Sequence, residues 1–322
     1  MPLSPITVVT VTFGAETALL EVQARSLARS LAPGDVAEII VIDNGRRAMG
    51  TATAARLRAR YGPLASRVRI LPVAELVPDM PAAIGWRTQQ VAKLVVAAEV
   101  ETPHYLILDA KNHLIRPAGL PDLVGEDGRA HGSTHPYTSH PLQAQLRTTL
   151  AYLGADAEQT RDAIANFPPT ATPFVMDTAL TRALVDDISR RARTPFAIEF
   201  ERAGLTEFFL YAGWVQLRGP GLEAVFDGTP IPSPTVWPKA RTAAGLDAVI
   251  AEASLSRSAF FAVHRTALAR GDAALRSALA RFWVGCGLFP DERAARAAIR
   301  RFRLKYYPEM AAKRIGEKLG RS

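Results

Sequence analysis

One carboxylate stands where a buried strand is expected to end. Residues 105–108 are apolar or aromatic and lead directly into Asp109, and a short continuous apolar run is typical of a buried strand in a parallel sheet. The turn-forming residues that follow place Asp109 at the carboxyl end of that strand, where ligands bind in open α/β sheets. Because Asp is also a common turn residue, the stretch alone leaves a site carboxylate and a simple cap equally open.

A second carboxylate, Glu207, comes just before the strongly apolar run 208–214. If this stretch is a helix, Glu207 and Tyr211 share a face. A Glu at the edge of an apolar segment can have its proton affinity raised by desolvation, which suits a general base. The alternative is a Glu at the start of a helix, where the macrodipole favours a negative charge.

Asp43 ends the strand predicted over 37–42 in the same way as Asp109. Two strand-end carboxylates on one side of a sheet outline a nucleotide crevice, although two turn-forming aspartates would give the same pattern. No G-x-G-x-x-G follows the first predicted strand, 6–12, and the sequence has no P-loop lysine motif. The usual NAD site and the usual nucleoside triphosphatase are therefore disfavoured.

A helix predicted over residues 82–100 carries Trp86, Gln90 and Lys93 along one face, while Ile84 belongs to the apolar face that would cover the sheet. A Lys and a Gln beside an aromatic residue could meet a phosphate and a sugar or base. The alternative is a solvated surface, which is the usual setting of a helical Lys.

The histidines fall into two groups. His264 ends the apolar run 260–263, so a phosphate or other ligand role and a satisfied structural role are equally open. His131, His135 and His140 are spaced by four and five residues. The Gly and Pro residues among them argue against the helix that presents paired zinc ligands, and no Cys joins them, so we expect a long loop over the site instead of a zinc centre.

The order of the predicted elements indicates the fold class. Strands alternate with helices in the first part of the chain, which favours a parallel sheet covered by helices. The expected strands there are 6–12, 37–42, 68–71 and 105–108, and the expected helices are 16–31 and 51–61. Farther along we expect a helix over 143–166, a strand over 173–176, a helix over 178–191 capped by Asp177, and a strand over 260–263.

The composition suits one large domain, or one domain and an extension. The chain has 322 residues, 48% of them hydrophobic, and no apolar run approaches the roughly 20 residues of a transmembrane helix. The N-terminus lacks the features of a signal peptide, and the single cysteine, Cys286, cannot form an internal disulfide. We therefore expect a cytoplasmic protein.

The net charge of +8 resides in the C-terminal residues, because 266–322 contain 13 Lys/Arg and 5 Asp/Glu. A helix ended by Pro308 is expected there. Its apolar stripe comprises Ala295, Ile299, Phe302 and Tyr306, and its basic stripe comprises Arg293, Arg296, Arg300 and Arg303. The pattern fits a helix docked on the protein body or a helix lying on an anionic membrane.

Five patches of the sequence, in their order and at their intervals, resemble bacterial glycosyltransferases of the GT-A type. They are residues 86–94, 105–112, 173–174, 207–211 and 263–265, within a region of resemblance over roughly residues 5–265. The resemblance implies a GT-A-like (Rossmann-like) α/β fold, with a mixed, mostly parallel sheet, helices on both faces and a helical C-terminal extension. We accordingly expect a glycosyltransferase domain over 1–265 and a basic extension over 266–322.

The resemblance also implies a nucleotide-sugar donor at the carboxyl ends of the strands, with Asp109 at the first position of a D-x-D motif. That motif usually holds Mn²⁺ or Mg²⁺ on the donor diphosphate, but here Lys111 replaces the second Asp. One carboxylate is a poor anchor for a hard cation, and Lys111 could pair with phosphate directly. A metal would have to be held by Asp109 together with His264.

Each candidate side chain has an expected role on this resemblance. The expected ligands of the nucleotide are Thr12, Asp43, Gln90 and Lys93, and those of the diphosphate are Asp109, Lys111 and His264. Glu207 would deprotonate the acceptor in an inverting displacement, whereas a retaining enzyme would need no such base.

The expected activity is sugar transfer to a glycan or lipid-linked acceptor in bacterial surface polysaccharide or glycan synthesis, with peripheral contact to the inner face of the membrane through the basic tail. Two alternatives stay open. One is a protein that binds sugar nucleotides without turnover, motivated by Lys111. The other is a nucleic-acid-binding protein, which is disfavoured because Tyr306-Tyr307 is the tail's only candidate stacking platform and no nucleic-acid module motif is present.

Overall fold

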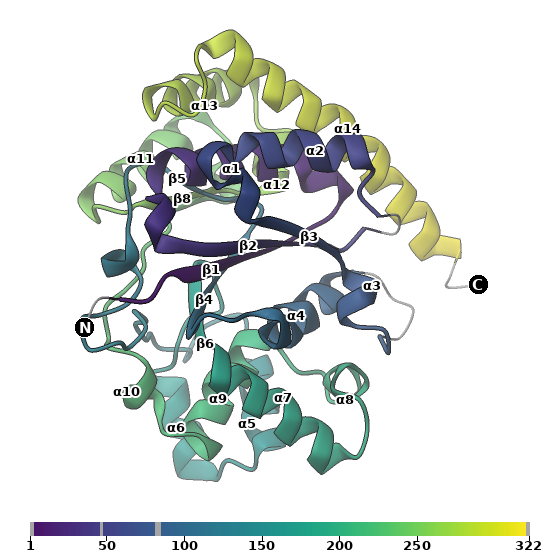
Figure 1. Cartoon of the computed structure of the whole chain (residues 1–322), viewed down its shortest axis with the longest axis vertical. Helices are drawn as coiled ribbons and strands as arrows, with labels where there is room; N and C mark the ends of the chain where they lie inside the picture. Colours follow the sequence, from purple (N-terminus) through teal and green to yellow (C-terminus); the bar gives the residue numbers. More distant parts are fainter. Residues whose placement is uncertain (1–2, 46–47, 81–84, 320–322) are drawn as a thin grey trace.

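A five-stranded, mostly parallel sheet forms the centre of the protein (Figure 1). The structure, a computed structural model, describes residues 3–45, 48–80 and 85–319, with side chains as far as residue 311. The strand order is β3-β2-β1-β4-β6, and β6 runs antiparallel to β4. The strands are β1 (Ile6–Thr12), β2 (Val36–Asp43), β3 (Val68–Pro72), β4 (His104–Asp109) and β6 (Phe174–Asp177). The predicted mixed, mostly parallel sheet is confirmed.

The central strand β1 explains why the sheet is buried. Each of its residues is β-branched and buried, and such side chains favour an extended backbone and pack well between layers. Parallel pairing with β2 on one side and β4 on the other leaves β1 inside the sheet. Successive strands are added on one side of β1 and then on the other, so the topological switch point lies between the carboxyl ends of β1 and β4.

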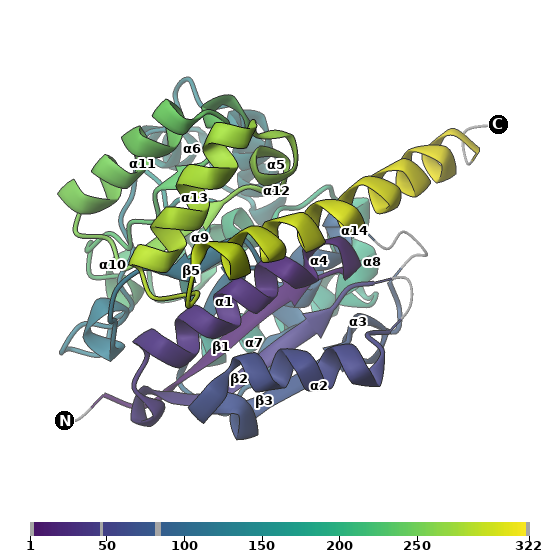
Figure 2. The ribbon, with the colours of Figure 1, turned by 90° about the horizontal axis from the view of Figure 1, so that it is seen from above.

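Helices cover both faces of this sheet, as the resemblance implied (Figures 1 and 2). One face carries α1 (Thr17–Ser30) and α2 (Thr51–Arg60), and the other carries α3 (Val73–Leu76) and α4 (Trp86–Val95). The structure begins α4 at Trp86, after Gly85. Ala82 and Ile84, which were assigned to this helix, lie outside the described residues.

A helical lobe packs below the sheet in the view of Figure 1. It consists of α5 (Gln143–Leu153), α6 (Ala157–Ala165), α7 (Thr178–Ala192), α8 (Phe196–Arg202), α9 (Glu207–Arg218) and the short α10 (Leu222–Val225). The single helix predicted over 143–166 is wrong, because Gly154 takes a left-handed conformation (φ 87°) that ends α5, and Asp156 caps α6. The predicted cap of α7 is confirmed, since the Leu180 N–H donates to Asp177 Oδ1 at 2.8 Å.

A small second sheet, in the order β5-β8-β7, lies beside the end of β4. Its strands are β5 (Asn112–Leu114), β7 (Thr235–Val236) and β8 (Phe260–Val263). Antiparallel pairing of β5 with β8 places Asn112 opposite Ala262, which brings the turn after Asp109 close to His264. Three helices accompany this sheet: α11 (Ala243–Leu255), α12 (Arg265–Arg270) and α13 (Ala273–Gly285).

The last helix, α14 (Glu292–Leu319), runs alongside α1 and extends beyond the other elements at its C-terminal end (Figure 2). The prediction that Pro308 ends this helix is wrong, because Pro308 lies inside it. The apolar stripe Ala295, Ile299, Phe302 and Tyr306 is buried against the body. Within the described part of the chain, no helix is long and apolar enough to cross a membrane.

Candidate functional site

A cavity of about 580 Å³ opens at the switch point of the main sheet. Its lining includes Asp109, the last residue of β4, and Lys111 just after it. Lys93 of α4, Glu207 in the first turn of α9 and His264 after β8 line it as well. Five of the eight side chains expected from the sequence therefore face one space, although they come from the main sheet, the helical lobe and the second sheet.

A buried polar network fixes the turn that presents Asp109. The Asp109 N–H donates to Asn112 Oδ1 (2.9 Å), and Gln23 Nε2 donates to the carbonyl oxygens of Asp109 (2.8 Å) and Asn112 (3.0 Å). The Thr10 hydroxyl in turn donates to Gln23 Oε1 at 2.8 Å. Since Thr10, Gln23 and Asn112 are fully buried, the carboxylate is held by groups that cannot exchange their partners for water.

The charges around Asp109 form a compact ion-pair cluster. Its Oδ1 lies 3.0 Å from the Lys93 ammonium, its Oδ2 pairs with Lys111, and Lys93 also lies 3.2 Å from Glu207 Oε1. Burial alone would raise the pKa of Asp109, but the Lys111 and Lys93 charges outweigh it and hold that pKa well below its usual range. Burial would likewise lower the pKa of Lys93, but Asp109 and Glu207 hold it above its ordinary value. Asp109 and Lys93 are therefore both ionised at neutral pH.

The predicted base, Glu207, is buried at the cavity wall. It begins α9, as its position before the apolar run predicted, and it is 5% exposed. Its backbone N–H donates to Gln90 Oε1 at 3.4 Å. The helix start thus places the carboxylate of Glu207 and the ammonium of Lys93 in contact across 114 residues of sequence.

Cationic and donor groups lie on the side of the cavity formed by the second sheet. His264 caps α12, because the Thr266 N–H donates to His264 Nδ1 at 3.1 Å. Burial, with the nearby charges of Arg265 and Lys111, lowers the pKa of His264 to about 4. The neutral ring then carries its proton on Nε2, which can donate to an anion. Arg265 also lines the cavity and pairs with Glu16 at 2.8 Å.

These donors do not fit a divalent metal. Both Asp109 oxygens already face ammonium groups, and the capping role of His264 Nδ1 leaves the protonated Nε2 toward any ligand. Hard cations prefer several oxygen ligands, and no cluster of three or more His, Cys, Asp or Glu side chains among the described residues could hold a metal ion. The predicted Asp109–His264 metal pair is therefore not supported by the chemistry of its donors.

Thr12, Asp43 and Gln90 are absent from the residues that line this cavity. Asp43 accepts the backbone N–H groups of Gly45 and Met49 in its own turn, as the turn-forming alternative expects, and its role as a nucleotide ligand stays a prediction. Thr12 and Gln90 are buried, and the described residues offer no hydrogen-bond partner to Thr12 Oγ1 or Gln90 Nε2. Their role as nucleotide ligands stays a prediction.

Three further residues belong to the site, and the sequence predicted no role for them. Thr172 lies 3.1 Å from Asp109 Oδ2 and 2.8 Å from Asn112 Oδ1, and Trp237 lines the cavity while 45% exposed. Trp237 follows a two-residue strand in a Pro-rich stretch, so no pattern marked it. Arg265 had a visible signal, because it directly follows His264 at the end of a predicted strand.

The three histidines of the long loop make two kinds of contact with the protein. His131 lies 2.7 Å from Asp227 and 2.9 Å from the carbonyl oxygen of Pro121. The rings of His135 and His140 pack against Tyr137 instead, with ring centroids 4.4 and 4.8 Å away. These contacts hold the loop in place.

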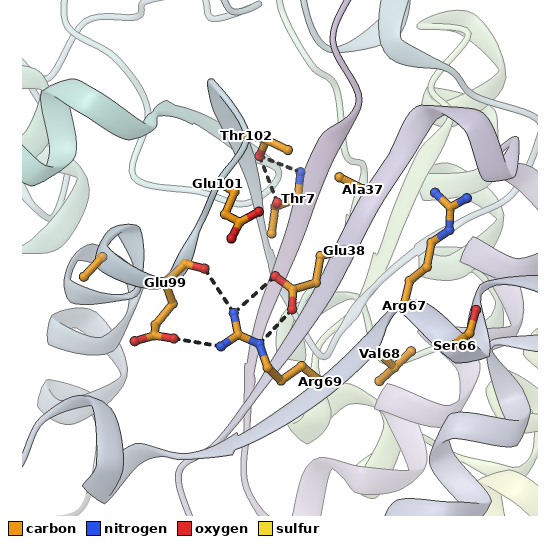
Figure 3. A pocket seen from close by; sticks show the side chains of 11 residues that line it. Thr7, Ala37, Glu38, Ser66, Arg67, Val68, Arg69, Glu99, Glu101 and Thr102 are labelled. Atoms are coloured by element: carbon orange, nitrogen blue, oxygen red, sulfur yellow. Dashed lines mark hydrogen bonds and ion pairs between the residues drawn. The ribbon is translucent and has the colours of Figure 1, made fainter.

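A second cavity, of about 610 Å³, lies at the opposite end of the strands of the main sheet (Figure 3). It includes Thr7 and Val68, near the amino ends of β1 and β3. Arg69 there binds the carboxylates of Glu38 and Glu99 at 2.7 Å each. Because the Arg69 guanidinium is already paired with two carboxylates, this cavity offers a ligand fewer cationic donors than the cavity at the switch point.

Solved glycosyltransferase structures are similar to this chain at low sequence identity. The galactosyltransferase LgtC, in complex with donor and acceptor sugar analogs, is 13% identical over 88% of this chain and 95% of that chain, with a TM-score of 0.45. The bifunctional glycosyltransferase WbbM is 9% identical over 80% of this chain and 45% of that chain (TM-score 0.43). Glucosyl-3-phosphoglycerate synthase from Mycobacterium tuberculosis, in complex with Mn²⁺, UDP and glucosyl-3-phosphoglycerate, is 17% identical over 63% and 67% (TM-score 0.37).

No curated protein matches the sequence. A family model does match most of the chain, over residues 18–243, and it describes a family of unknown function, DUF6492. The chain therefore belongs to the DUF6492 family.

Proposed function

We propose that this protein is a glycosyltransferase that moves a sugar from a nucleotide-sugar donor to an acceptor hydroxyl. The observation that carries the proposal is the composition of one cavity at the switch point of an α/β sheet. Asp109 and Glu207 lie on either side of one buried ammonium. Lys111, His264 and Arg265 line the same cavity and supply the donors that a diphosphate needs.

The residues would divide the reaction as follows. Lys111, Arg265 and the His264 Nε2–H bind the diphosphate and stabilise the negative charge that grows on it as the bond to the anomeric carbon breaks. The acceptor oxygen forms the new bond to that carbon from the opposite side. Its proton passes to the Glu207 carboxylate, and the nucleoside diphosphate leaves. This is an inverting displacement, whose stereochemical course can be read directly from the anomeric configuration of the product.

No step in this account runs through a metal. A divalent cation would neutralise the same diphosphate, but the Asp109 oxygens that would hold it are paired with Lys93 and Lys111. We propose that Lys111 takes over this charge, since an ammonium is a compact point charge suited to phosphate.

The decisive experiment is a thermal-shift screen with UDP-, GDP-, CMP- and dTDP-sugars, followed by a turnover assay with the sugar nucleotide that raises the melting temperature. A transferase is stabilised by one of them and releases its nucleotide when an acceptor is added. A protein that binds the donor without turnover is stabilised but releases nothing. Stabilisation by oligonucleotides and by none of the sugar nucleotides would instead support the nucleic-acid-binding alternative.

We further propose that the acceptor is a glycan or lipid-linked saccharide of a bacterial surface polymer, made at the inner face of the membrane. The supporting feature is the basic helix α14, whose Arg293, Arg296 and Arg300 are exposed. Each Lys or Arg near an anionic surface contributes about 1 kcal/mol. The residues beyond 265 would then form an extension that brings the catalytic residues 1–265 to their acceptor.

A further inference from the structure

Lys93 lies between two carboxylates that come from distant parts of the chain. Its ammonium is 3.0 Å from Asp109 Oδ1 and 3.2 Å from Glu207 Oε1, and its side chain is only 7% exposed. The ring of Phe208 lies 5.0 Å from the same ammonium, and the Tyr105 hydroxyl donates to the Lys93 carbonyl oxygen at 3.0 Å. Both the backbone and the charged end of Lys93 are therefore fixed in place.

We propose that Lys93 is a positioning residue for the transfer step and does not bind the nucleotide. It holds Asp109 and Glu207 in a fixed relation, so that the carboxylate paired with Lys111 and the base face the same reaction centre. This inference rests on the proposed function, and it changes the nucleotide-binding role that the family resemblance implied for Lys93.

Two neighbouring carboxylates such as Asp109 and Glu207 repel each other when both are ionised. Without a cation between them, like charges in a partly dry site compete to keep a proton, and one carboxylate loses the ionised form that a base requires. One ammonium that contacts both removes this conflict and fixes their geometry. If Lys93 turned toward a phosphate, Glu207 would lose the one cation paired with it among the described residues, and a buried charge without its partner is costly.

Lys111 is the cation that remains available to the donor. It contacts Asp109 alone of these carboxylates, and its side chain is 21% exposed, three times the exposure of Lys93. Lys111 can therefore exchange Asp109 for a phosphate oxygen, while Lys93 still neutralises Asp109. The remaining ion pair at the cavity, Glu16 with Arg265, acts on Asp109 and Lys111 only through charge, and among the described residues neither of its members pairs with Lys93.

The first test separates nucleotide binding from transfer. Lys93→Met should keep the dissociation constant of the nucleoside diphosphate that the parent binds within about threefold, while kcat falls by about 100-fold or more. Lys93→Arg should recover part of kcat, because its guanidinium can still contact both carboxylates. Lys111→Met should show the reverse, with nucleotide affinity about tenfold weaker. If Lys93→Met loses the nucleotide as Lys111→Met does, Lys93 is a ligand and the proposal fails.

The second test needs no donor, so it still decides if the proposed function is wrong. Lys93→Met should lower the melting temperature strongly in the parent but little in an Asp109→Asn/Glu207→Gln background, where no carboxylate is left without a partner. If Lys93→Met alone does not fold, the triple variant should still fold. An equal loss in both backgrounds, or an unfolded triple variant, overturns the proposal. The exposed Lys239, which does not line the cavity, gives the matched control Lys239→Met, and it should change neither measurement.

Discussion

At the scale of single residues, the site depends on one carboxylate that contacts two cations. Asp109 accepts from Lys93, Lys111 and Thr172, and the network around Gln23 fixes its backbone. With these partners, Asp109 fixes the positions of both lysines at the reaction centre. The two ammonium groups also explain why a charged Asp, and no neutral isostere, suits this position.

Replacing Asp109 by Asn should therefore abolish transfer while the fold persists. The amide keeps the shape of the side chain but leaves Lys111 without a counter-charge, so we expect kcat to fall by about 100-fold or more. Glu207 still pairs with Lys93, so a cooperative unfolding transition should remain. A variant with activity within about twofold of the parent would sink this assignment.

The position of Lys111 leads to a second prediction, that activity does not require a divalent cation. Because an ammonium already occupies the third position of the motif, activity should survive EDTA at least in part. Lys111→Asp supplies the second carboxylate that a hard cation needs, and that variant should bind Mn²⁺ in a calorimetric titration where the parent does not. Complete loss of parent activity in EDTA, restored by Mn²⁺, would show that the parent has a working metal site.

The sequence predicted the members of this site better than their contacts. Asp109, Glu207 and His264 were marked because each stands at the edge of an apolar run, and Lys111 was marked because it replaces the second Asp of the D-x-D motif. The pairing of Lys93 with Glu207 was not predicted, since it joins residues 114 positions apart and depends on how the helical lobe packs on α4. The role of Asp43 stays a prediction for a related reason, because a strand-end site Asp and a turn-capping Asp have the same local sequence.

At the scale of elements, local patterns located the main strands and failed where tertiary contacts decide. The β-branched run of β1 and the apolar run of β4 were sufficient to predict buried strands. The two-residue β7 and three-residue β5 have no pattern of their own, because pairing with β8 alone makes them strands. The antiparallel direction of β6 was also hidden, since an apolar run does not encode the direction of its neighbour.

The second sheet contains a buried histidine that should make stability depend on pH. His113, in β5, accepts from Trp283 Nε1 of α13 at 3.1 Å. Burial lowers the pKa of His113 to about 4, below the value near 6.5 in an unfolded chain. Between about pH 4 and pH 6.5 the unfolded state therefore binds more protons at this residue than the folded state does. The stabilisation is complete above about pH 6.5 and is lost as the pH falls toward 4.

We expect the free energy of unfolding, measured by urea denaturation between pH 7 and 4, to fall with a slope of up to about 1.4 kcal/mol per pH unit from this group. His113→Gln should reduce that slope, and the loop variant His135→Gln should leave it unchanged. Some slope should remain in His113→Gln, because the pKa of His264 is also lowered to about 4 by burial. An unaltered slope in His113→Gln would contradict the assignment.

At the scale of the whole molecule, α14 packs its apolar stripe against the rest of the protein. Ile299, Phe302 and Tyr306 are buried against neighbouring elements, and Arg301 lies 3.7 Å from Glu21 of α1. Of the two alternatives for the apolar stripe, docking on the body is the one seen. A proline inside a helix removes one backbone hydrogen bond and clashes with the carbonyl group four residues earlier. The helix nevertheless continues past Pro308, and Met310 beyond it packs against the core.

Deleting residues 291–322 should consequently destabilise the body. Burial of one large apolar side chain contributes about 1.5–3 kcal/mol, so the loss of three should remove much of a typical domain's 5–15 kcal/mol. We expect a markedly lower melting temperature, followed by circular dichroism. A truncated protein that melts at the parent temperature would show that the docked helix contributes little.

Because the apolar stripe is covered, any membrane contact of α14 must be electrostatic. Arg293, Arg296 and Arg300 are exposed, whereas Arg303, also assigned to the basic stripe, donates to the carbonyl oxygen of Ala269 at 3.1 Å. Three exposed arginines, of which Arg296 also pairs with Glu292 at 2.6 Å, contribute up to about 3 kcal/mol at an anionic surface. This supports weak and reversible binding that salt weakens over a Debye length of about 8–10 Å.

Full-length protein should accordingly sediment with phosphatidylserine-containing liposomes at low salt, should be released by 0.5 M NaCl (a Debye length of roughly 4 Å), and should ignore neutral liposomes. The triple variant Arg293→Ser/Arg296→Ser/Arg300→Ser is a sharper test than truncation, because it removes charge from the solvent face and leaves the docked stripe intact. It should lose liposome binding while keeping its melting temperature and its nucleotide affinity. Retained binding in this variant, or no binding by the parent at low salt, would show that the exposed arginines serve some purpose other than membrane contact.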